Sequence, residues 1–166
     1  MTTRAAVASD AAVITAIYNE GIEDRVATFE TEPRTEEQVR AMLDDAKRYP
    51  IIVCEREGDV MAWARVSKYR DRACYDGVGE ASVYVARAGR GNGAGTAVLE
   101  ALCAAAEAKG YWKLVSRIFE TNKASRALCK RVGFTEVGIY RRHAKLDGEW
   151  KDCVIVEKLL VEAAKP

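Results

Sequence analysis

Residues 90–102, which read RGNGAGTAVLEAL, limit the possible folds of this chain more than any other stretch. The run before them, residues 81–85, carries β-branched and aromatic residues at alternate positions and predicts a strand. The run after them is rich in Ala, Leu, Glu and Lys and is closed by Gly110, which predicts a helix with a glycine stop. Glycines let backbone N–H groups approach a ligand, and a helix N-terminus adds about half a positive charge. The stretch therefore predicts a site for a phosphate or pyrophosphate between a strand and a helix.

Other strand–turn–helix structures fit the same stretch less well. A P-loop is excluded because no Gly-Lys-Ser/Thr follows the glycines. Residues 89–94 fit the G-x-G-x-x-A variant of a dinucleotide fingerprint, but that motif also needs an acid about 20 residues on. Glu120, the nearest acid beyond the next predicted strand, comes later, and too little chain follows for a doubly wound sheet. A nicotinamide-dependent oxidoreductase is thus a distant alternative, and a tight turn with purely structural glycines is another.

Two blocks of the sequence resemble the GNAT superfamily of N-acetyltransferases. Residues 90–95 read R-G-x-G-x-G before a Leu-rich helix, similar to the family motif in which an arginine or glutamine, two residues and Gly-x-Gly/Ala wrap the CoA pyrophosphate. Residues 120–134, ETNKASRALCKRVGF, are similar to the family's later block, N-x-x-(A/S)-x-x-L-(Y)-x-x-x-G-F. Both blocks stand in the family's order and at its separation, so the pair is far more specific than either block alone.

This resemblance implies a fold, a co-substrate and a set of binding residues. The fold is α+β, an α/β three-layer arrangement in which helices flank a mixed, mostly antiparallel central sheet. The co-substrate is acetyl-CoA, and a backbone N–H of Tyr84 or Val85 would polarise the acetyl carbonyl. The residues expected to bind acetyl-CoA are Val83, Tyr84, Val85, Arg90, Gly91, Asn92, Gly93, Ala94, Gly95, Thr96, Asn122 and Ser125.

Glu80 is the candidate general base. An amine with a pKa near 10.4 is almost wholly protonated at neutral pH, so a base assists its attack on a thioester. Residues 80–85, EASVYV, closely resemble the ESTVYV segment of phosphinothricin N-acetyltransferases, in which the glutamate is assigned as the base. A solvated glutamate at a strand end is the alternative interpretation.

The similarity to phosphinothricin N-acetyltransferases extends to the segments expected to hold the acceptor. Residues 29–33, 70–76 and 147–152 resemble its F-R-T-E-P, K-x-R-x-x-Y-D and G-x-W-x-D segments. Members act on phosphinothricin, and close relatives act on arsinothricin or methionine sulfoximine. The guanidinium of an arginine binds an oxyanion through two N–H groups, and a tyrosine adds a hydroxyl donor. A polar loop with both residues is therefore suited to hold the carboxylate of an amino-acid substrate. The expected substrate-binding residues are Phe29, Arg70, Arg72 and Tyr75.

The chain departs from the family at the residue that would protonate the CoA thiolate. The family often has a tyrosine at the position of Cys129. Phosphinothricin enzymes carry a histidine either at that position or near the terminal Gly-x-Trp, and there this chain has Cys129 and Asp147. His143 lies a few residues from the latter. The sequence leaves Cys129, His143 and water open as the proton donor.

Composition and charge argue against several other classes of protein and of site. The 166 residues include 26 Lys+Arg and 25 Asp+Glu, so the chain lacks the basic excess typical of nucleic-acid binding. Five scattered cysteines without a C-x-x-C pair, and a single histidine, argue against a disulfide framework or a metal site. With no apolar run long enough for a membrane span and no signal peptide, we expect one cytoplasmic domain over residues 1–166.

The expected elements alternate in the order of a GNAT fold. We predict strands at residues 3–8, 51–55, 60–66, 79–85, 113–118, 134–141 and 150–159. Helices are expected after caps at Ser9-Asp10, Thr35 and Asn122 and after the glycine loop, with the Thr35 helix ending near Arg48. We also expect a homodimer paired through the apolar residues 154–156. The alternative functions are a GNAT acting on a protein N-terminus, polyamine or aminoglycoside, and a non-catalytic acyl-CoA-binding module.

Overall fold

The computed structural model describes residues 1–160 as a seven-stranded sheet with helices on both faces. The strands run in the order β1-β2-β3-β4-β5-β7-β6, and every adjacent pair is antiparallel except β4 and β5. This is the mixed, mostly antiparallel sheet expected from the sequence. The strands are β1 (Thr2–Ala5), β2 (Ile51–Arg56), β3 (Asp59–Lys68), β4 (Val78–Val85), β5 (Lys113–Phe119), β6 (Thr135–Leu146) and β7 (Glu149–Leu159). The helices are α1 (Ala11–Glu23), α2 (Glu36–Asp44), α3 (Ala94–Ala108) and α4 (Lys123–Arg131), with 3₁₀ turns η1 (Ala8–Asp10), η2 (Asp45–Lys47), η3 (Ala73–Tyr75) and η4 (Arg87–Gly89).

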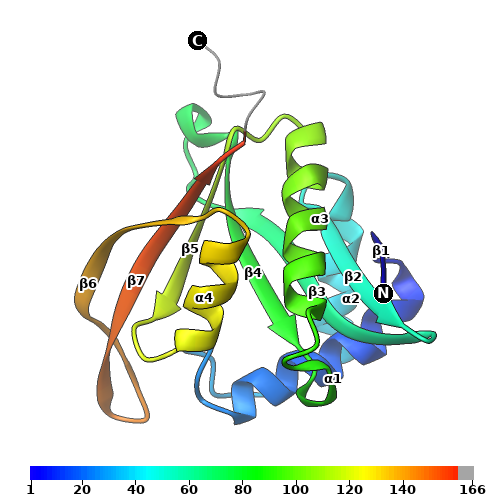
Figure 1. Cartoon of the computed structure of the whole chain (residues 1–166), viewed down its shortest axis with the longest axis horizontal. Coiled ribbons are helices and arrows are strands. Elements are labelled where there is room, and N and C mark those ends of the chain that lie inside the picture. The colour runs from blue at the N-terminus through cyan, green and yellow to red at the C-terminus, as the bar shows by residue number, and fades with distance from the viewer. Residues whose placement is uncertain (161–166) are drawn as a thin grey trace.

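The helices form the two outer layers. Figure 1 shows α3 and α4 in front of the sheet and α1 and α2 behind it. Because side chains alternate along a strand, Ala62, Ala64 and Val66 of β3 join the core under α3, whereas Trp63 joins the core under α1 and α2. The sheet is therefore buried on both faces at its centre.

The parallel strands β4 and β5 pair over only three residues. Residues 78–80 of β4 pair in order with residues 113–115 of β5, so that Val78 lies opposite Lys113 and Glu80 opposite Val115. Beyond Glu80 and Val115 the two strands separate, so the C-terminal half of β4 lacks a neighbour on that side. The glycine loop follows β4 directly and leads into α3.

Most element boundaries agree with the sequence analysis, and the differences have local causes. The capping box that begins α2 is present, since Thr35 Oγ1 accepts from Gln38 N at 3.3 Å and Gln38 Oε1 accepts from Thr35 N at 3.0 Å. However, α2 ends at Asp44 and continues only as η2, short of the predicted Arg48. β6 is longer than predicted and continues to Leu146, because its second half pairs with the start of β7 across the Asp147–Gly148 turn.

The expected pairing surface at residues 154–156 is wrong. Val154 and Val156 are fully buried in the core under α3, and β7 lies between β5 and β6 rather than at an edge. The apolar character of these residues reflects core packing. The exposed edge strand on this side of the sheet is β6.

Candidate active site

A cavity of about 500 Å³ opens where β4 and β5 separate. Its walls come from β4, β5, the starts of α3 and α4, and the end of α1 with the segment that follows it. Of the residues predicted to bind acetyl-CoA, those that line it are Val83, Tyr84, Val85, Arg90, Gly91, Gly93, Gly95, Thr96, Asn122 and Ser125. Asn92 and Ala94 belong to the same loop but are not among the lining residues. The two sequence blocks thus meet at one cavity.

The glycine loop leaves the N-terminus of α3 open to an anion. Gly91 and Gly93 have φ angles of +78° and +85°, in the left-handed region that other residues rarely adopt. Gly93 is the N-cap residue and has no side chain, so the first N–H groups of α3 have no capping acceptor. A Cβ on Gly95 would lie 3.1 Å from Val85 Cγ2 and 3.2 Å from Leu128 Cδ2, so this glycine lets α3 lie close to β4 and α4.

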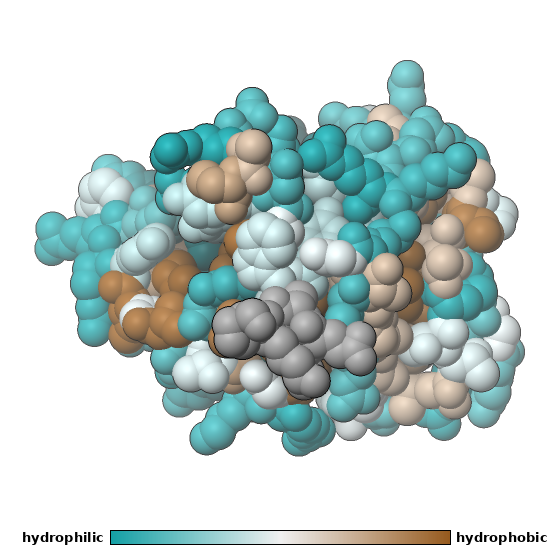
Figure 2. Space-filling view, turned by 90° about the horizontal axis from the view of Figure 1, so that it is seen from above, coloured by the Kyte–Doolittle hydropathy of each residue, from teal (hydrophilic) through white to brown (hydrophobic). Residues whose placement is uncertain are grey.

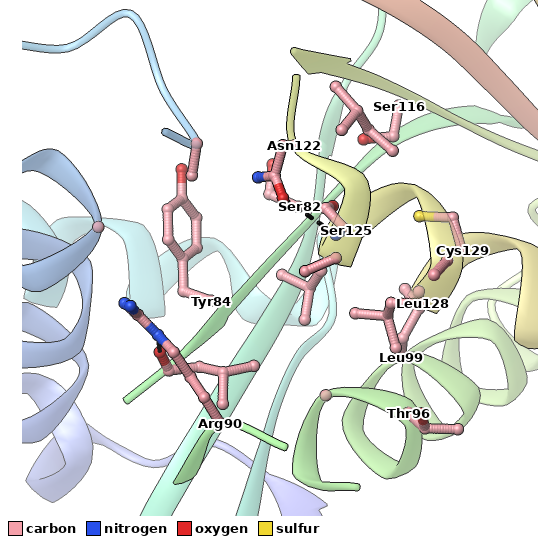
Figure 3. Close-up of a pocket in the computed structure, with 18 of the residues that line it drawn as sticks. Ser82, Tyr84, Arg90, Thr96, Leu99, Ser116, Asn122, Ser125, Leu128 and Cys129 are labelled. Carbon is pink, nitrogen blue, oxygen red and sulfur yellow. Dashed lines mark hydrogen bonds between the residues drawn. The ribbon is translucent and has the colours of Figure 1, made fainter. Parts of the chain in front are cut away.

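Asn122 connects α4 to the segment that follows α1. Its Oδ1 accepts from Ser125 N at 3.0 Å, which confirms the predicted cap of α4, as Figure 3 shows. Its Nδ2 donates to the carbonyl of Val26 at 3.0 Å, in the segment after α1. Both Val26 and Ala27 line the cavity, and no pattern in the sequence predicts a site role for either.

The separated half of β4 presents backbone N–H groups at alternate residues. Ala86 N donates to Met61 O of β3 at 2.9 Å, so by alternation the N–H of Tyr84 also points to β3. The N–H groups of Val83 and Val85 therefore point into the gap toward β5. Of the two candidates for polarising a carbonyl, Val85 has this orientation and Tyr84 does not.

The Tyr84 side chain lies on the α1 side of the sheet. Its ring is stacked on Trp63 at 5.0 Å between centroids and contacts Tyr18 at 4.6 Å. Burial, followed by the nearby Tyr18, raises the pKa of Tyr84 well above its ordinary value, so this phenol stays neutral. In Figure 3 the ring points away from Leu99 and Leu128, which line the opposite wall.

Arg90 is held by an acid that the sequence analysis missed. Its Nη2 donates to Asp24 Oδ2 at 2.5 Å, and its Nε lies 3.4 Å from the carbonyl oxygen of Val85. Asp24, at the end of α1, also accepts from Arg87 Nη2 at 2.7 Å. The hydrogen bonds from Arg87 and then Arg90 lower the pKa of the Asp24 carboxyl. Figure 3 shows the Arg90 side chain on the Tyr84 side of the cavity, away from Thr96 on α3.

Glu80 stands beside the cavity, paired with a second residue that the sequence analysis missed. It is the last residue of β4 that pairs with β5, and Arg117 Nη2 of β5 donates to its Oε1 at 2.6 Å. Arg117 lines the cavity, whereas Glu80 does not. An arginine within a mostly apolar strand, KLVSRIF, was the available signal for Arg117. The pair lies on the α1 side of the sheet, where strand alternation places Tyr84 as well.

The two side chains considered as acids for the thiolate differ in position. Cys129 of α4 lines the cavity but is buried, and burial raises the pKa of its thiol to about 12. A thiol with this pKa is a poor proton donor to a leaving thiolate of ordinary pKa, near 8.5. His143 lies outside the cavity lining, with its ring 5.0 Å from that of Tyr140 and 6.5 Å from that of Phe29.

The residues predicted to bind the acceptor lie outside this cavity. Arg70 and Arg72 precede η3, and Tyr75 is its last residue, next to the start of β4. The guanidinium of Arg70 lies over the ring of Tyr69, 5.3 Å from its centroid. Phe29 packs against Phe119 at 4.7 Å between ring centroids. The η3 loop therefore adjoins the Glu80 end of β4, whereas the glycine loop adjoins the other end.

Comparison with known proteins decides the family. The sequence model of the Acetyltransferase (GNAT) family matches residues 14–134, which include both sequence blocks. The chain belongs to the GNAT family. A phosphinothricin N-acetyltransferase of Streptomyces viridochromogenes is 33% identical over 153 residues, 90% of this chain and 82% of that protein. An L-methionine sulfoximine/L-methionine sulfone acetyltransferase of Pseudomonas aeruginosa is 32% identical over 157 residues, 93% of this chain and 91% of that protein.

A solved GNAT structure agrees with the fold over almost the whole chain. The phosphinothricin acetyltransferase of Sinorhizobium meliloti, in complex with acetyl-CoA, has a TM-score of 0.88 at 32% identity and covers 99% of this chain and 92% of its own. The GNAT fold expected from the sequence is confirmed, as is the class of enzyme, an acetyl-CoA-dependent N-acetyltransferase.

The cavity has the features that a GNAT co-substrate requires. Open N–H groups at the start of α3, two left-handed glycines and Arg90 suit a pyrophosphate. The side chains of Val83, Leu99 and Leu128 give an apolar wall for a long arm. No cluster of metal-ligating side chains occurs within residues 1–160, and no helix in that range is long and apolar enough to cross a membrane.

Proposed function

We propose that this GNAT enzyme transfers the acetyl group of acetyl-CoA to the α-amine of a small amino acid of the phosphinothricin type. The observation that carries the proposal is the composition of the cavity wall. It includes Leu99 from the α3 side of the sheet and Arg117 and Val26 from the α1 side. A co-substrate bound along the glycine loop and an acceptor near Glu80 could therefore meet through the gap between β4 and β5.

The chain's own residues supply binding and orientation for the co-substrate. The loop from Arg90 to Thr96 holds the pyrophosphate through backbone N–H groups and the Arg90 guanidinium, while Asn122 and Ser125 form the opposite wall. When bound, acetyl-CoA supplies an acetyl group activated as a thioester. The N–H of Val85, with that of Val83 beside it, points to where the carbonyl oxygen would lie and polarises it.

Glu80 accepts the proton of the attacking amine, directly or through one water. Arg117 holds the Glu80 carboxylate in place at 2.6 Å and must share it with the amine. The CoA thiolate leaves as the anion and takes its proton from solvent afterwards, because a thiol with an ordinary pKa of about 8.5 is a good leaving group. Neither Cys129, which is buried, nor His143, which lies outside the cavity lining, is then needed as the acid.

Phe29, Arg70, Arg72 and Tyr75 remain the proposed acceptor-binding residues. Their support is the similarity of their segments to those of phosphinothricin enzymes. The relatives also include a phosphinothricin N-acetyltransferase and an L-methionine sulfoximine/L-methionine sulfone acetyltransferase. Arg72 precedes η3 and Tyr75 is its last residue, and η3 precedes the strand that carries Glu80. They are suited to bind the α-carboxylate.

Replacement of Glu80 by Gln tests the mechanism. Glutamine keeps the shape and removes the basicity, so kcat at neutral pH should fall by roughly 10²–10⁴-fold. The rate should recover in part at high pH, where more of the amine is already deprotonated. Acetyl-CoA affinity, measured by calorimetry, should stay unchanged and serves as the control for folding. Full activity of Glu80→Gln at neutral pH would remove Glu80 from the mechanism.

We further propose that the enzyme is a cytoplasmic homodimer, as expected from the sequence, but paired through β6. Val137, Ile139 and Tyr140 of β6 and Trp150 of β7 have 39–53% of their surface exposed. Figure 2, a view from above, shows an apolar patch on the left, the side that carries β6 in Figure 1. Exposed apolar side chains on an edge strand favour pairing with another chain.

A further inference from the structure

A second hollow, of about 530 Å³, lies between α2 and the C-terminal half of β3. Two cationic side chains of β3, Arg65 and Lys68, line it together with Ser67. The acid Asp45 lines it from the end of α2 and forms no ion pair with Arg65. The proposed reaction at the first cavity uses none of these residues.

Arg65 is half-buried and has no bound partner. Within residues 1–160, its side chain makes no hydrogen bond and no ion pair. Lys68, by contrast, is paired with Asp71. A guanidinium that is partly removed from water gains most from an anion that its fork can bind through two N–H groups. Arg65 interacts electrostatically with Glu30 but forms no ion pair with it, so its guanidinium is free to bind an anion from outside the protein.

Glu30, the acid whose charge Arg65 influences, is already paired with other groups. Glu30 is bound by Arg34 through an ion pair and by the hydroxyl of Tyr18 at 3.2 Å. Burial alone would raise the pKa of the Glu30 carboxyl, but Arg34, with smaller contributions from Tyr18 and Arg65, leaves it below its ordinary value. Glu30 is thus ionised and satisfied by groups other than Arg65.

The register of the sheet places Arg65 beside the proposed acceptor site. Arg65 pairs with Ser82 of β4, and Ser67 pairs with Glu80. Ser67 Oγ also donates to the Glu80 carbonyl at 3.3 Å. Directly paired residues of antiparallel strands have Cβ atoms roughly 5 Å apart, and diagonal neighbours roughly 7–8 Å. Side chains alternate along β3, so Arg65 shares the face of Trp63, which is the face of Tyr84 and Glu80.

We propose that Arg65 binds an acidic group on the side chain of the acceptor, so that the enzyme prefers amino acids with an anionic side chain. This inference rests on the proposed function, because it places the amine beside Glu80. The α-carboxylate lies toward the η3 loop, and the side chain extends across Ser82 and Ser67 into the hollow. Arg65 is then the residue that selects the acceptor.

Two acceptors that differ in side-chain charge test the inference. Phosphinothricin carries an anionic phosphinate, whereas methionine sulfone carries a neutral sulfone on a similar side chain, and both have an α-carboxylate. Arg65→Gln should lower kcat/KM for phosphinothricin by roughly 10- to 100-fold, chiefly through KM. Its kcat/KM for methionine sulfone should stay within about twofold of the wild-type value. Arg65→Lys should restore part of the loss, because it keeps the charge without the fork.

Lys68→Gln is the matched control. It removes a cation from the same hollow, but one already paired with Asp71, so both acceptors should be used as by the wild type. An equal fall for both acceptors in Arg65→Gln, or no fall for either, would overturn the inference and leave the proposed function standing. Preference of the wild-type enzyme for methionine sulfone over phosphinothricin would also overturn it. Failure of the wild type to acetylate any amino acid would overturn the proposed function itself.

Discussion

Asp24 connects the end of α1 to the two arginines at the mouth of the cavity. It accepts hydrogen bonds from Arg87 and Arg90 at 2.7 and 2.5 Å, and 20% of its side chain is exposed. A pyrophosphate at the start of α3 would compete with Asp24 for Arg90. Asp24 also places a negative charge near that anion, so it opposes binding in two ways.

Removal of this charge should strengthen co-substrate binding. Partly exposed ion pairs contribute at most about 1 kcal/mol, so Asp24→Asn should lower the acetyl-CoA Kd by about two- to fivefold in calorimetry. Arg90→Ala should raise the Kd by about tenfold or more, because a charge-assisted contact is lost. Glu23→Gln is the control, since Glu23 contacts only Arg87 of this pair and is more exposed. Weaker acetyl-CoA binding by Asp24→Asn would show that Asp24 positions Arg90 and does not compete for it.

The edge strand β6 is the element with the most exposed apolar side chains. Its residues are exposed along nearly its whole length, and within residues 1–160 its only sheet neighbour is β7. At the opposite edge, β1 is only four residues long. Native proteins usually protect a long edge strand, and a second copy of the chain is one way to do so.

A charge on β6 should therefore separate the proposed dimer. Light scattering of the wild type should give the mass of a dimer, and Ile139→Glu should give that of a monomer, because burying an unpaired carboxylate is costly. Val7→Glu is the control, since Val7 is comparably exposed but follows β1 at the other edge. Circular dichroism should show both variants folded. A monomeric wild type at assay concentration would end the proposal.

At the scale of the whole molecule, the sequence predicted what local patterns encode. The prediction of a strand–glycine–helix unit was correct because Gly91 and Gly93 adopt a left-handed backbone that glycine favours. The prediction of the Asn122 cap was correct because its hydrogen bond joins residues only three positions apart. Local sequence patterns do not determine over how many residues β4 and β5 pair, so the opening between the two strands was not predicted.

The missed residues of the site depend on contacts between distant segments. Asp24 and Arg90 are 66 residues apart, and Arg117 and Glu80 are 37 apart. Arg65 looked like an ordinary strand residue, because only the register with Ser82 places it beside the proposed acceptor. For the same reason, residues 154–156 resembled a pairing surface until the sheet order placed β7 inside.

The central claim is that this chain transfers an acetyl group to a small amino acid, and one measurement tests it most directly. The purified protein is mixed with acetyl-CoA and phosphinothricin, methionine sulfone, a polyamine, an aminoglycoside or a peptide with a free N-terminus. Thiol release and the mass of the product are then followed together. We predict N-acetylated phosphinothricin in one-to-one ratio with released CoA, and much slower reaction with the polyamine, aminoglycoside and peptide. Acetyl-CoA binding with no thiol release for any amine, or acetylation of only those other amines, would contradict the account.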